Sequence, residues 1–501
     1  MKNRKTLNYF LKKLGISYDL PSELSDFSPV GITADSRKVK KGFVFVAKKG
    51  LNFDGHNFLK SAYKNGAVCA FVEKIYDIPG FPQIKTESVN DILPELLSLY
   101  YDRPETKFKK IALTGTNGKT TTSYILDSIF SKAGYVTGVI GTISYRYADV
   151  TESAPFTSPD PEILYPLLHR MVEKGVEVLI MEVSSHALKQ KRIGNLKFDA
   201  ALLTNFTQDH LDFHKTMDDY AASKRILFEK HLKDNAIVAV WSETLRKNEI
   251  IPELLSKTEY SLNPSSQVDY KCVDYNLSVK GITGYIKTPE SKFPFKLKLI
   301  GEHNILNLTG ALIIADGFGI STRTSLKAVE NTIVPGRLEP VGERLNIFVD
   351  YAHTPDALDR AQDSLNKLKK SGRLITVFGC GGERDAQKRP LMGKSVNDKS
   401  EIAIVTSDNP RREDPLKIIE EILTGMEGKK LKSEDVASAK KGIIVIPDRR
   451  QAIFTAIQGA NEADLILIAG KGHEDYQILG TEKIHFDDKE VAAEAEKLKW
   501  K

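Results

Sequence analysis

The sequence has few cysteines and no long apolar run, and each of these features argues against a class of protein. Only three cysteines occur among 501 residues, at positions 69, 272 and 380. Cysteines this far apart form neither a disulfide framework nor a CxxC metal pair, which favours a reducing compartment. No stretch approaches the roughly 18 apolar residues that a membrane-spanning helix needs. We therefore expect a cytoplasmic protein without a membrane span.

Concentrated basic charge is scarce as well. The net charge is only +6, and a nucleic-acid-binding protein would carry a dense basic stripe interleaved with aromatic residues. We expect no nucleic-acid partner, and the modest positive charge either serves solubility or suits sites for anionic ligands. A hydrophobic content of 41% with 28% charged residues is typical of a folded chain. Leu7, Phe10, Leu11 and Leu14 have the spacing of a docked amphipathic helix rather than of an export signal.

The length and the alternation of apolar runs predict an α/β protein of three domains. Residues 1–109 read as a small α/β domain, residues 110–335 as a central P-loop-type domain with a parallel sheet, and residues 336–501 as a Rossmann-like domain. A more polar, β-rich insertion is expected at residues 237–299. The predicted strands lie at 42–47, 66–72, 110–114, 176–183, 198–204, 346–349, 374–378, 402–406, 442–446 and 465–469.

The strongest motif lies between a predicted strand and a predicted helix in the second segment. Its glycines allow backbone N–H groups to close around phosphate oxygens at a helix N-terminus. Lys119 would then reach the β- and γ-phosphates, and the Thr120 hydroxyl would bind Mg²⁺. Position 113, a glycine in the usual Walker pattern, is Leu113 here, so a structural turn is the alternative. The motif comprises Gly115, Thr116, Asn117, Gly118, Lys119, Thr120 and Thr121.

Polar residues also follow the next predicted strands. Glu182 ends an apolar strand, where a carboxylate points into the ligand crevice of a parallel sheet and could bind Mg²⁺; the alternative is an ordinary solvated glutamate at a strand end. His210 follows another strand and could be a metal or phosphate neighbour. Lys224 lies four residues after Tyr220 on a predicted helix, and from the residues alone it is an ordinary solvated lysine.

Three polar loops follow strands of the third segment, at residues 379–385, 408–411 and 470–474. Glycines in the first loop permit close approach of a ligand to the backbone, and Pro410 stiffens the second. The alternative is three ordinary surface loops. Together they would form a second site with charges of both signs, which suits a zwitterion.

With these motifs in view, the chain resembles the Mur ligases over nearly its full length, and particularly those that add the third residue of the peptidoglycan stem peptide. Two differences occur, because the family's Thr-Thr-Pro stretch is Thr157-Ser158-Pro159 here and a leucine often found before Asp35 is Ala34. The matching stretches are 35–37 with Gly42, 115–122, 181–186, 209–212, Tyr220 with Lys224, 301–307, 335–339, 350–356, 379–393, 408–411 and 469–476.

The resemblance implies a role for each matching residue. Lys119, Glu182, His210 and Lys224 would be catalytic, with Thr120, Glu182, His210 and Lys224, the last as a carbamate, serving Mg²⁺. The UDP-linked precursor would contact Ser36, Thr157, Ser158, Ser184, Gln190 and Arg192. Asn304, Arg337, Asp350 and His353 would close over ATP. The incoming amino acid would contact Arg384, Asp408, Asn409, Pro410, Arg411, Gly470 and Glu474.

The resemblance also implies the reaction. ATP would phosphorylate the γ-carboxylate of D-Glu in UDP-MurNAc-L-Ala-D-Glu, and the amine of an amino acid would displace phosphate to form an amide. Arg411 selects the amino acid in this interpretation, since a guanidinium can pair bidentately with the second carboxylate of meso-diaminopimelate, which lysine lacks.

Two alternatives remain open at this stage. One is another member of the superfamily, such as a folylpolyglutamate synthetase or a Mur ligase acting at a different step. The other is a P-loop ATP-binding module or switch without ligase chemistry, in which the loops of the third segment would have no role.

Overall fold

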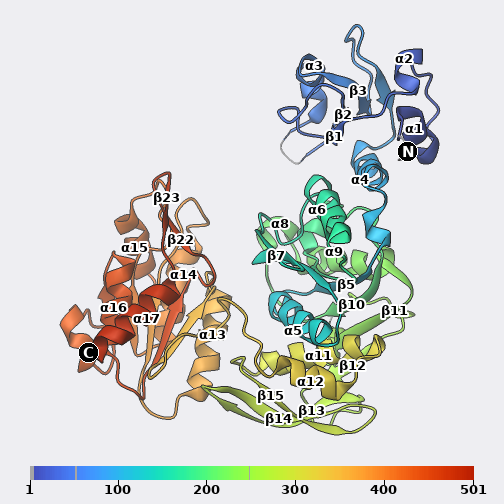
Figure 1. Ribbon diagram of the computed structural model, residues 1–501. Helices are drawn as coiled ribbons and strands as arrows, with labels where there is room; N and C mark the ends of the chain where they lie inside the picture. Colours follow the sequence, from blue (N-terminus) through green and yellow to red (C-terminus); the bar gives the residue numbers. More distant parts are fainter. Residues whose placement is uncertain (1–4, 51–52, 248, 501) are drawn as a thin grey trace. The chain divides into compact units, whose positions relative to one another are not determined.

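The computed structural model describes residues 5–50, 53–247 and 249–500, without the side chains of residues 211, 212 and 245–247. The chain forms two compact units, one comprising Met1–Tyr260 and Gly310–Ser321 and the other Ser261–Thr309 and Thr322–Lys501 (Figure 1). No helix among the described residues combines the length and the apolar character needed to cross a membrane.

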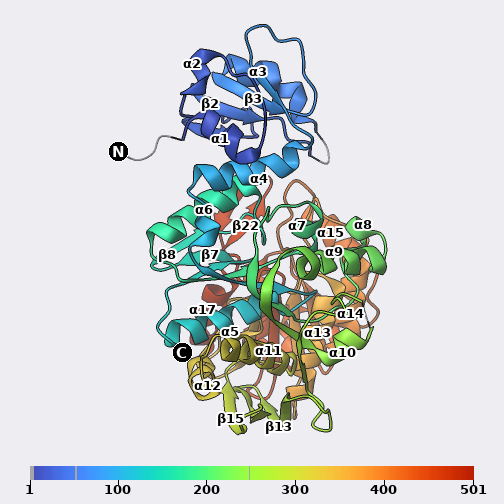
Figure 2. The ribbon, with the colours of Figure 1, turned by 90° about the vertical axis from the view of Figure 1, so that its right-hand side faces the viewer.

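The first unit begins with a small parallel sheet whose strand order is β1-β2-β3-β4. Helix α1 buries Leu7, Phe10 and Leu11, which confirms the predicted amphipathic helix. Helix α4 packs beside α6 of the central domain (Figure 2). The elements are α1 (Leu7–Leu14), α2 (Ser22–Ser25), β1 (Gly31–Thr33), β2 (Phe43–Val46), α3 (Leu59–Lys64), β3 (Ala67–Val72), β4 (Gln83–Lys85) and α4 (Val89–Tyr100).

The central sheet of the first unit has the order β12-β11-β10-β5-β9-β6-β7-β8, parallel from β12 to β6. Leu113 pairs with Glu182 and Thr114 with Leu203, so the loops after β5, β9 and β10 start at one edge. The strands are β5 (Lys109–Thr114), β6 (Thr137–Ile140), β7 (Ser144–Tyr147), β8 (Val150–Ser153), β9 (Val178–Glu182), β10 (Phe198–Leu203), β11 (Leu232–Trp241) and β12 (Thr258–Ser261).

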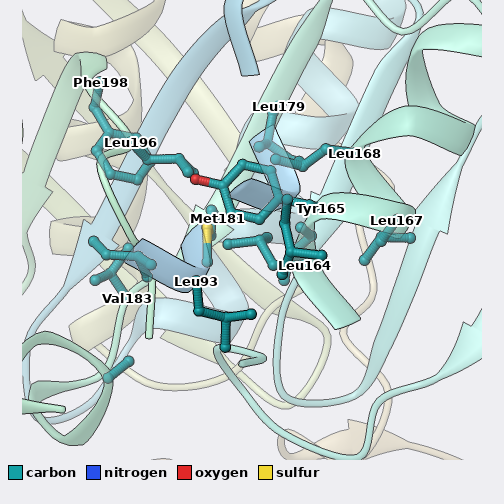
Figure 3. Packing of buried hydrophobic residues seen from close by; sticks show 14 of the residues in the cluster. Leu93, Leu164, Tyr165, Leu167, Leu168, Leu179, Met181, Val183, Leu196 and Phe198 are labelled. Carbon is teal, nitrogen blue, oxygen red and sulfur yellow. The ribbon is translucent and has the colours of Figure 1, made fainter. Parts of the chain in front are cut away.

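Helices cover this sheet and hold its central strands in place. Figure 3 shows Leu164, Tyr165 and Leu168 of α6 packed near Leu179 and Met181 of β9, all within one buried cluster. This packing fixes the strand that ends in the predicted metal-binding carboxylate. The helices are α5 (Lys119–Lys132), α6 (Pro161–Glu173), α7 (Ser185–Lys189), α8 (Leu211–His214), α9 (Met217–Lys230), α10 (Ser242–Lys247) and α11 (His303–Gly317), whose residues are divided between the two units.

The β-rich insertion that we predicted at residues 237–299 is wrong in its first part. Strand β11 pairs in parallel with β10, and β12 pairs in parallel with β11, so both belong to the central sheet. The first residues of β11 are mostly exposed, whereas Val238, Ala239 and Val240, which lie inside the predicted insertion, are buried in the core. Only β13 (Tyr270–Ser278), β14 (Gly281–Lys287) and β15 (Lys292–Leu297) form an antiparallel meander.

The second unit contains a sheet of order β16-β17-β21-β18-β19-β20, parallel except for β16. One buried cluster involves α13, α14 and α15, and another involves α16 and α17, so helices cover both faces as predicted. Its elements are α12 (Thr322–Val329), β16 (Glu339–Pro340), β17 (Asn346–Asp350), α13 (Pro355–Leu368), β18 (Leu374–Phe378), α14 (Lys388–Lys399), β19 (Ile402–Val405), α15 (Pro415–Leu423), β20 (Gly442–Val445), α16 (Arg449–Gly459), β21 (Leu465–Ala469), the hairpin β22 (Tyr476–Leu479) with β23 (Glu482–His485), and α17 (Asp488–Lys499).

Candidate functional site

The phosphate-loop motif lies between β5 and α5, as predicted. Gly115 has φ 142° and Gly118 has φ 87°, values that side chains rarely allow. A Cβ atom on Gly115 would lie 1.9 Å from the Thr204 hydroxyl oxygen. Both glycines are therefore required by the path of the loop, which leads into the N-terminus of a 14-residue helix.

Residues after β10 hold this loop in shape. The Thr116 N–H donates to the Asn205 carbonyl at 3.0 Å, and the Asn117 N–H donates to Asn205 Oδ1 at 2.9 Å. In return, the Thr204 hydroxyl donates to the Asn117 carbonyl at 2.6 Å. Thr204 and Asn205 were not predicted as site residues, although their position just after a strand of the parallel sheet was a usable signal.

Two lysines converge on one carbonyl of the loop. Lys119 Nζ donates to the Gly115 and Thr116 carbonyls at 2.8 and 2.9 Å, and Lys224 Nζ donates to the Gly115 carbonyl at 3.0 Å. The Lys224 side chain is buried and lies over the Tyr220 ring, 4.5 Å from its centroid. Burial, and then the charge of Lys119, hold the pKa of Lys224 well below its usual value. Lys224 is therefore not the solvated lysine that its sequence alone suggested.

Glu182, at the end of β9, is buried and surrounded by neutral donors. Thr120 Oγ1 donates to Glu182 Oε2 at 3.0 Å. Thr142 donates from its backbone N–H at 3.1 Å and from its hydroxyl at 2.9 Å. A Cβ atom on Gly141 would lie 2.4 Å from Glu182 Oε1, so this glycine admits the carboxylate. Thr142 is a further site residue that we did not predict, and its signal was its place after β6, the neighbour of β9.

The chemistry of this corner fits a magnesium ion. Mg²⁺ prefers oxygen ligands and usually keeps several waters, so one carboxylate and one hydroxyl are sufficient protein donors. The hydrogen bonds that the Glu182 carboxylate accepts in the described part of the chain come from the neutral groups of Thr120 and Thr142, so this buried carboxylate retains the capacity to bind a cation. His210 has φ 53°, and its ring packs edge-on against His186, with 4.9 Å between the centroids.

Three predicted precursor-binding residues adjoin Glu182. The Ser158 hydroxyl donates to the Glu182 carbonyl at 2.9 Å and accepts from the Ser184 N–H at 3.0 Å. Thr157 Oγ1 lies 3.1 Å from Thr142 Oγ1. The structure thus joins the predicted precursor residues to the carboxylate beside the phosphate loop.

The other predicted precursor residues occupy two further places. Arg192 Nε donates to Gln190 Oε1 at 2.8 Å and lies 3.4 Å from Asp160 Oδ1. The half-buried guanidinium of Arg192 lies just after the end of α7. Ser36 lies in the loop after β1, where its carbonyl accepts from Asn65 Nδ2 at 2.9 Å. This loop belongs to the N-terminal sheet.

The second unit contains the residues predicted to close over a nucleotide. Asp350 accepts two backbone N–H groups at 2.7 and 2.8 Å, and burial raises its pKa. The Arg337 guanidinium lies 5.0 Å from the centroid of the Tyr351 ring, and His353 Nδ1 lies 2.8 Å from the Tyr351 carbonyl oxygen. Asn304 donates to a backbone carbonyl at 2.8 Å. Asp350, Arg337 and His353 therefore lie close together beside Tyr351.

The three loops predicted to bind an amino acid lie together, because β18, β19 and β21 are neighbouring strands. Asn409 Nδ2 donates to Glu474 Oε2 at 3.1 Å. Gly470 has φ 117°, and a Cβ atom there would lie 2.7 Å from Asp408 Oδ2. Burial, together with the charge of Asp408, raises the pKa of Glu474. Arg384 is exposed on the loop after β18.

Arg411 is held by the backbone on both sides. Its N–H donates to the Ile478 carbonyl at 3.1 Å, and its carbonyl accepts from the Gly480 N–H at 2.7 Å. Its Nη1 donates to the Gly382 carbonyl at 2.7 Å, which orients the guanidinium. The backbone of Arg411 is left-handed, with φ 52°, and the buried Pro410 precedes it. The hairpin formed by β22 and β23, which the sequence analysis did not identify, thus supports the predicted specificity residue.

A phosphate loop at the edge of a parallel sheet, with a second doubly wound sheet that carries its own polar loops, defines a multidomain nucleotide-binding protein. Three family models match the chain along its length. They are the Mur ligase family, catalytic domain, at residues 30–101, the Mur ligase middle domain at residues 113–315, and the Mur ligase, glutamate ligase domain at residues 336–472.

Relatives match over nearly the whole chain. A Geobacter sulfurreducens protein is 39% identical over 497 residues, which cover 96% of each chain, and a Fusobacterium nucleatum protein is 41% identical over 491 residues, which cover 95% of this chain and 96% of that one. Both are named UDP-N-acetylmuramoyl-L-alanyl-D-glutamate–2,6-diaminopimelate ligase. A solved structure of a protein with that name aligns with a TM-score of 0.70 and 29% identity, covering 98% of this chain and 99% of that one. The chain belongs to the Mur ligase family.

Membership confirms the predicted three-domain α/β architecture and the predicted resemblance. The boundaries at residues 109 and 335 and the individual site residues stay predictions.

Proposed function

We propose that this Mur ligase family member is a cytoplasmic, ATP-dependent ligase that adds meso-diaminopimelate to the D-Glu γ-carboxylate of UDP-MurNAc-L-Ala-D-Glu. The observation that carries the proposal is the cluster of Asp408, Asn409, Arg411 and Glu474, which combines carboxylates, an amide and an oriented guanidinium at one sheet edge. Such a set suits the zwitterionic end of diaminopimelate. The names of the relatives that match nearly end to end support the same substrates.

The phosphate end of the reaction belongs to the first unit. Lys119, now bonded to two carbonyls of its own loop, would turn to the β- and γ-phosphates of ATP, with the backbone from Gly115 to Thr121 around them. Thr120 and Glu182 would hold Mg²⁺, together with His210 and the carbamate of Lys224. When bound, this ion would neutralise charge on the transferring phosphoryl group.

The chemistry that we propose proceeds through an acyl phosphate. A γ-carboxylate oxygen of the precursor attacks the γ-phosphorus of ATP, the bond to ADP breaks, and Lys119 stabilises the charge that develops on the phosphoryl oxygens. The amine of diaminopimelate then attacks the acyl carbon, phosphate leaves, and the amine loses a proton as the amide forms. Thr157, Ser158 and Ser184 would orient the precursor, because they lie beside Glu182 at the same sheet edge.

Recognition of the remaining ligand groups would be distributed over other loops. Ser36, Gln190 and Arg192 would contact the precursor, and Asn304, Arg337, Asp350 and His353 would contact ATP. In the amino-acid cluster, Arg411 would pair with the distal carboxylate and Glu474 with the adjacent ammonium, while Arg384, Pro410 and Gly470 complete the loops that surround them.

The test is phosphate release with ATP and UDP-MurNAc-L-Ala-D-Glu against a panel that contains meso-diaminopimelate and L-lysine. Sites built around a polar partner reject an analogue that lacks it by about 10⁴-fold, so we expect a strong preference for diaminopimelate. Arg411→Ala should lose that preference by using diaminopimelate poorly, at a cost of about 2–5 kcal/mol. The neighbouring Arg412 is exposed, and Arg412→Ala is the matched control.

Three results would contradict the proposal. Equal use of both amino acids by the wild type, or unchanged discrimination in Arg411→Ala, would refute the specificity. Phosphate release that does not depend on the UDP-linked precursor would refute the ligase reaction itself.

A further inference from the structure

Lys471, to which neither the motifs nor the resemblance gave a role, occupies the centre of the amino-acid cluster. Its side chain has 0% exposure. Its Nζ lies 3.1 Å from Asn409 Oδ1, 3.4 Å from Asp408 Oδ1 and 3.9 Å from Glu474 Oε2. Lysine is almost never fully buried without partners, and here its hydrogen-bond and ion-pair partners are residues proposed to contact the amino acid.

These contacts determine which way the Asn409 amide faces. Asn409 Oδ1 accepts from both Lys471 Nζ and the Ile478 N–H, the latter at 3.0 Å, so this atom must be the oxygen. The amide nitrogen then faces Glu474 Oε2 and donates to it at 3.1 Å. Within the described contacts Glu474 uses Oε2 for both neighbours, so Oε1 keeps the capacity to accept from a ligand ammonium.

Lys471 also balances the charge of the cluster. Asp408 and Glu474 are two carboxylates, and Lys471 and Arg411 are two cations, so the four groups together are neutral. A neutral set with both signs complements a zwitterionic α-amino acid centre, whereas the same set without Lys471 would carry one net negative charge and repel its carboxylate. The lysine also opposes the effect of burial and of Asp408, which raise the pKa of Glu474.

We propose that Lys471 is a positioning residue that determines specificity for an amino acid with a zwitterionic distal end, by orienting Asn409 and Glu474 and by neutralising the pair of carboxylates. The inference rests on the proposed function, because it concerns the amino-acid subsite of that reaction. It predicts a defect confined to the second half of the reaction, in which the amine attacks.

The test compares Lys471→Met, which keeps the volume and removes the charge, with Lys369→Met. Lys369 is a matched control, since it is a half-buried, ion-paired lysine, bound to Glu401 at 2.7 Å, but at the opposite end of β19. Two quantities are measured, namely kcat and KM for meso-diaminopimelate and for L-lysine, and the exchange of labelled ADP into ATP with precursor alone. The exchange reports reversible acyl phosphate formation without any amino acid.

We expect KM for diaminopimelate to rise at least about tenfold in Lys471→Met, with the preference over lysine falling by a similar factor, while the exchange rate stays within about twofold of wild type. Lys369→Met should behave like wild type in every measurement. If Lys471→Met does not fold, Lys471→Gln, which keeps a donor for Asn409, replaces it. For this variant we expect a smaller rise in KM for diaminopimelate.

An unchanged KM for diaminopimelate in the folded variant would overturn the inference. A parallel loss of exchange and ligation would also overturn it, because it would indicate a merely structural lysine. Failure of the proposed function is distinguishable from both, since in that case the wild type itself would ligate no amino acid to the precursor.

Discussion

The burial of Lys224 predicts how the activity and the stability of the enzyme change when this side chain is replaced by methionine. The amine donates to the Gly115 carbonyl at 3.0 Å, and both burial and the charge of Lys119 lower its pKa. A lowered pKa favours the neutral amine, which is the form that adds CO₂ and releases a proton to become a carbamate. Lys224→Met keeps the shape of the side chain and removes this chemistry.

The expected effects on activity and on stability differ in size. Loss of one preorganised charged group at a transition state costs about 10²–10³ in kcat. The free energy of unfolding should change by no more than about 1 kcal/mol, because one hydrogen bond is lost and the desolvation of an amine is relieved. The Gly115 carbonyl is not orphaned, since it still accepts from Lys119 at 2.8 Å.

The assay is precursor-dependent phosphate release together with thermal unfolding, and Lys230→Ala on the exposed face of α9 is the control. Lys224→Ala, which leaves space, should be partly rescued by acetate or formate. A Lys224→Met enzyme with near-normal kcat in bicarbonate-free buffer would refute the carbamate. A large loss of stability in that variant would instead refute our account of the burial.

Three further predictions concern the loop, a buried ion pair and a titration. Gly115→Ala should reduce ATP turnover by at least about 100-fold. Gly134→Ala, also at positive φ but with open space around its Cβ, should remain active, and equal activity of the two variants would contradict the steric argument. Arg449 and Asp488 form a fully buried pair at 2.7 Å, so Arg449→Met should cost about 3–5 kcal/mol in urea unfolding, and adding Asp488→Leu should recover part of it. A double variant as unstable as the single one would argue against this account. Burial lowers the pKa of Lys110 from 10.5 to about 8, so the unfolded state binds more protons between these values and stability rises with pH. The free energy of unfolding of the wild type should therefore rise by about 3 kcal/mol relative to that of Lys110→Met as the pH rises from about 8 to 10.5. Parallel pH profiles of the melting temperature for the two proteins would refute this prediction.

Most strands of the fold could be predicted because buried parallel strands are short apolar runs bounded by turns. Strand β21 matches its prediction of residues 465–469, and β18 matches residues 374–378. Strand β11 was assigned wrongly because the predicted insertion began at residue 237, inside this strand, whereas residues 237–240 pair with β10 in the central sheet. Local polarity does not reveal that long-range pairing.

The candidate site was predictable where a residue belongs to a motif at the end of a strand, as with Glu182, the last residue of β9, and Lys119, which opens the helix after β5. Thr142 belongs to no motif, and its contact with Glu182 depends on the pairing of β6 with β9. Lys471 lies within a predicted loop, but only the fold shows that its amine turns inward. The burial of Lys224 had a partial signal, since it shares a helix face with Tyr220.

If Arg411 selects the amino acid, as we propose, its left-handed backbone limits how that preference can change. At φ 52° β-branched side chains are strongly disfavoured, whereas asparagine, aspartate and glycine are tolerated. The hairpin bonds to Ile478 and Gly480 use only backbone atoms and so persist whatever side chain is present. Evolution can therefore exchange the chemistry displayed at this position without rebuilding the loop, but only within the small set of residues that this conformation admits.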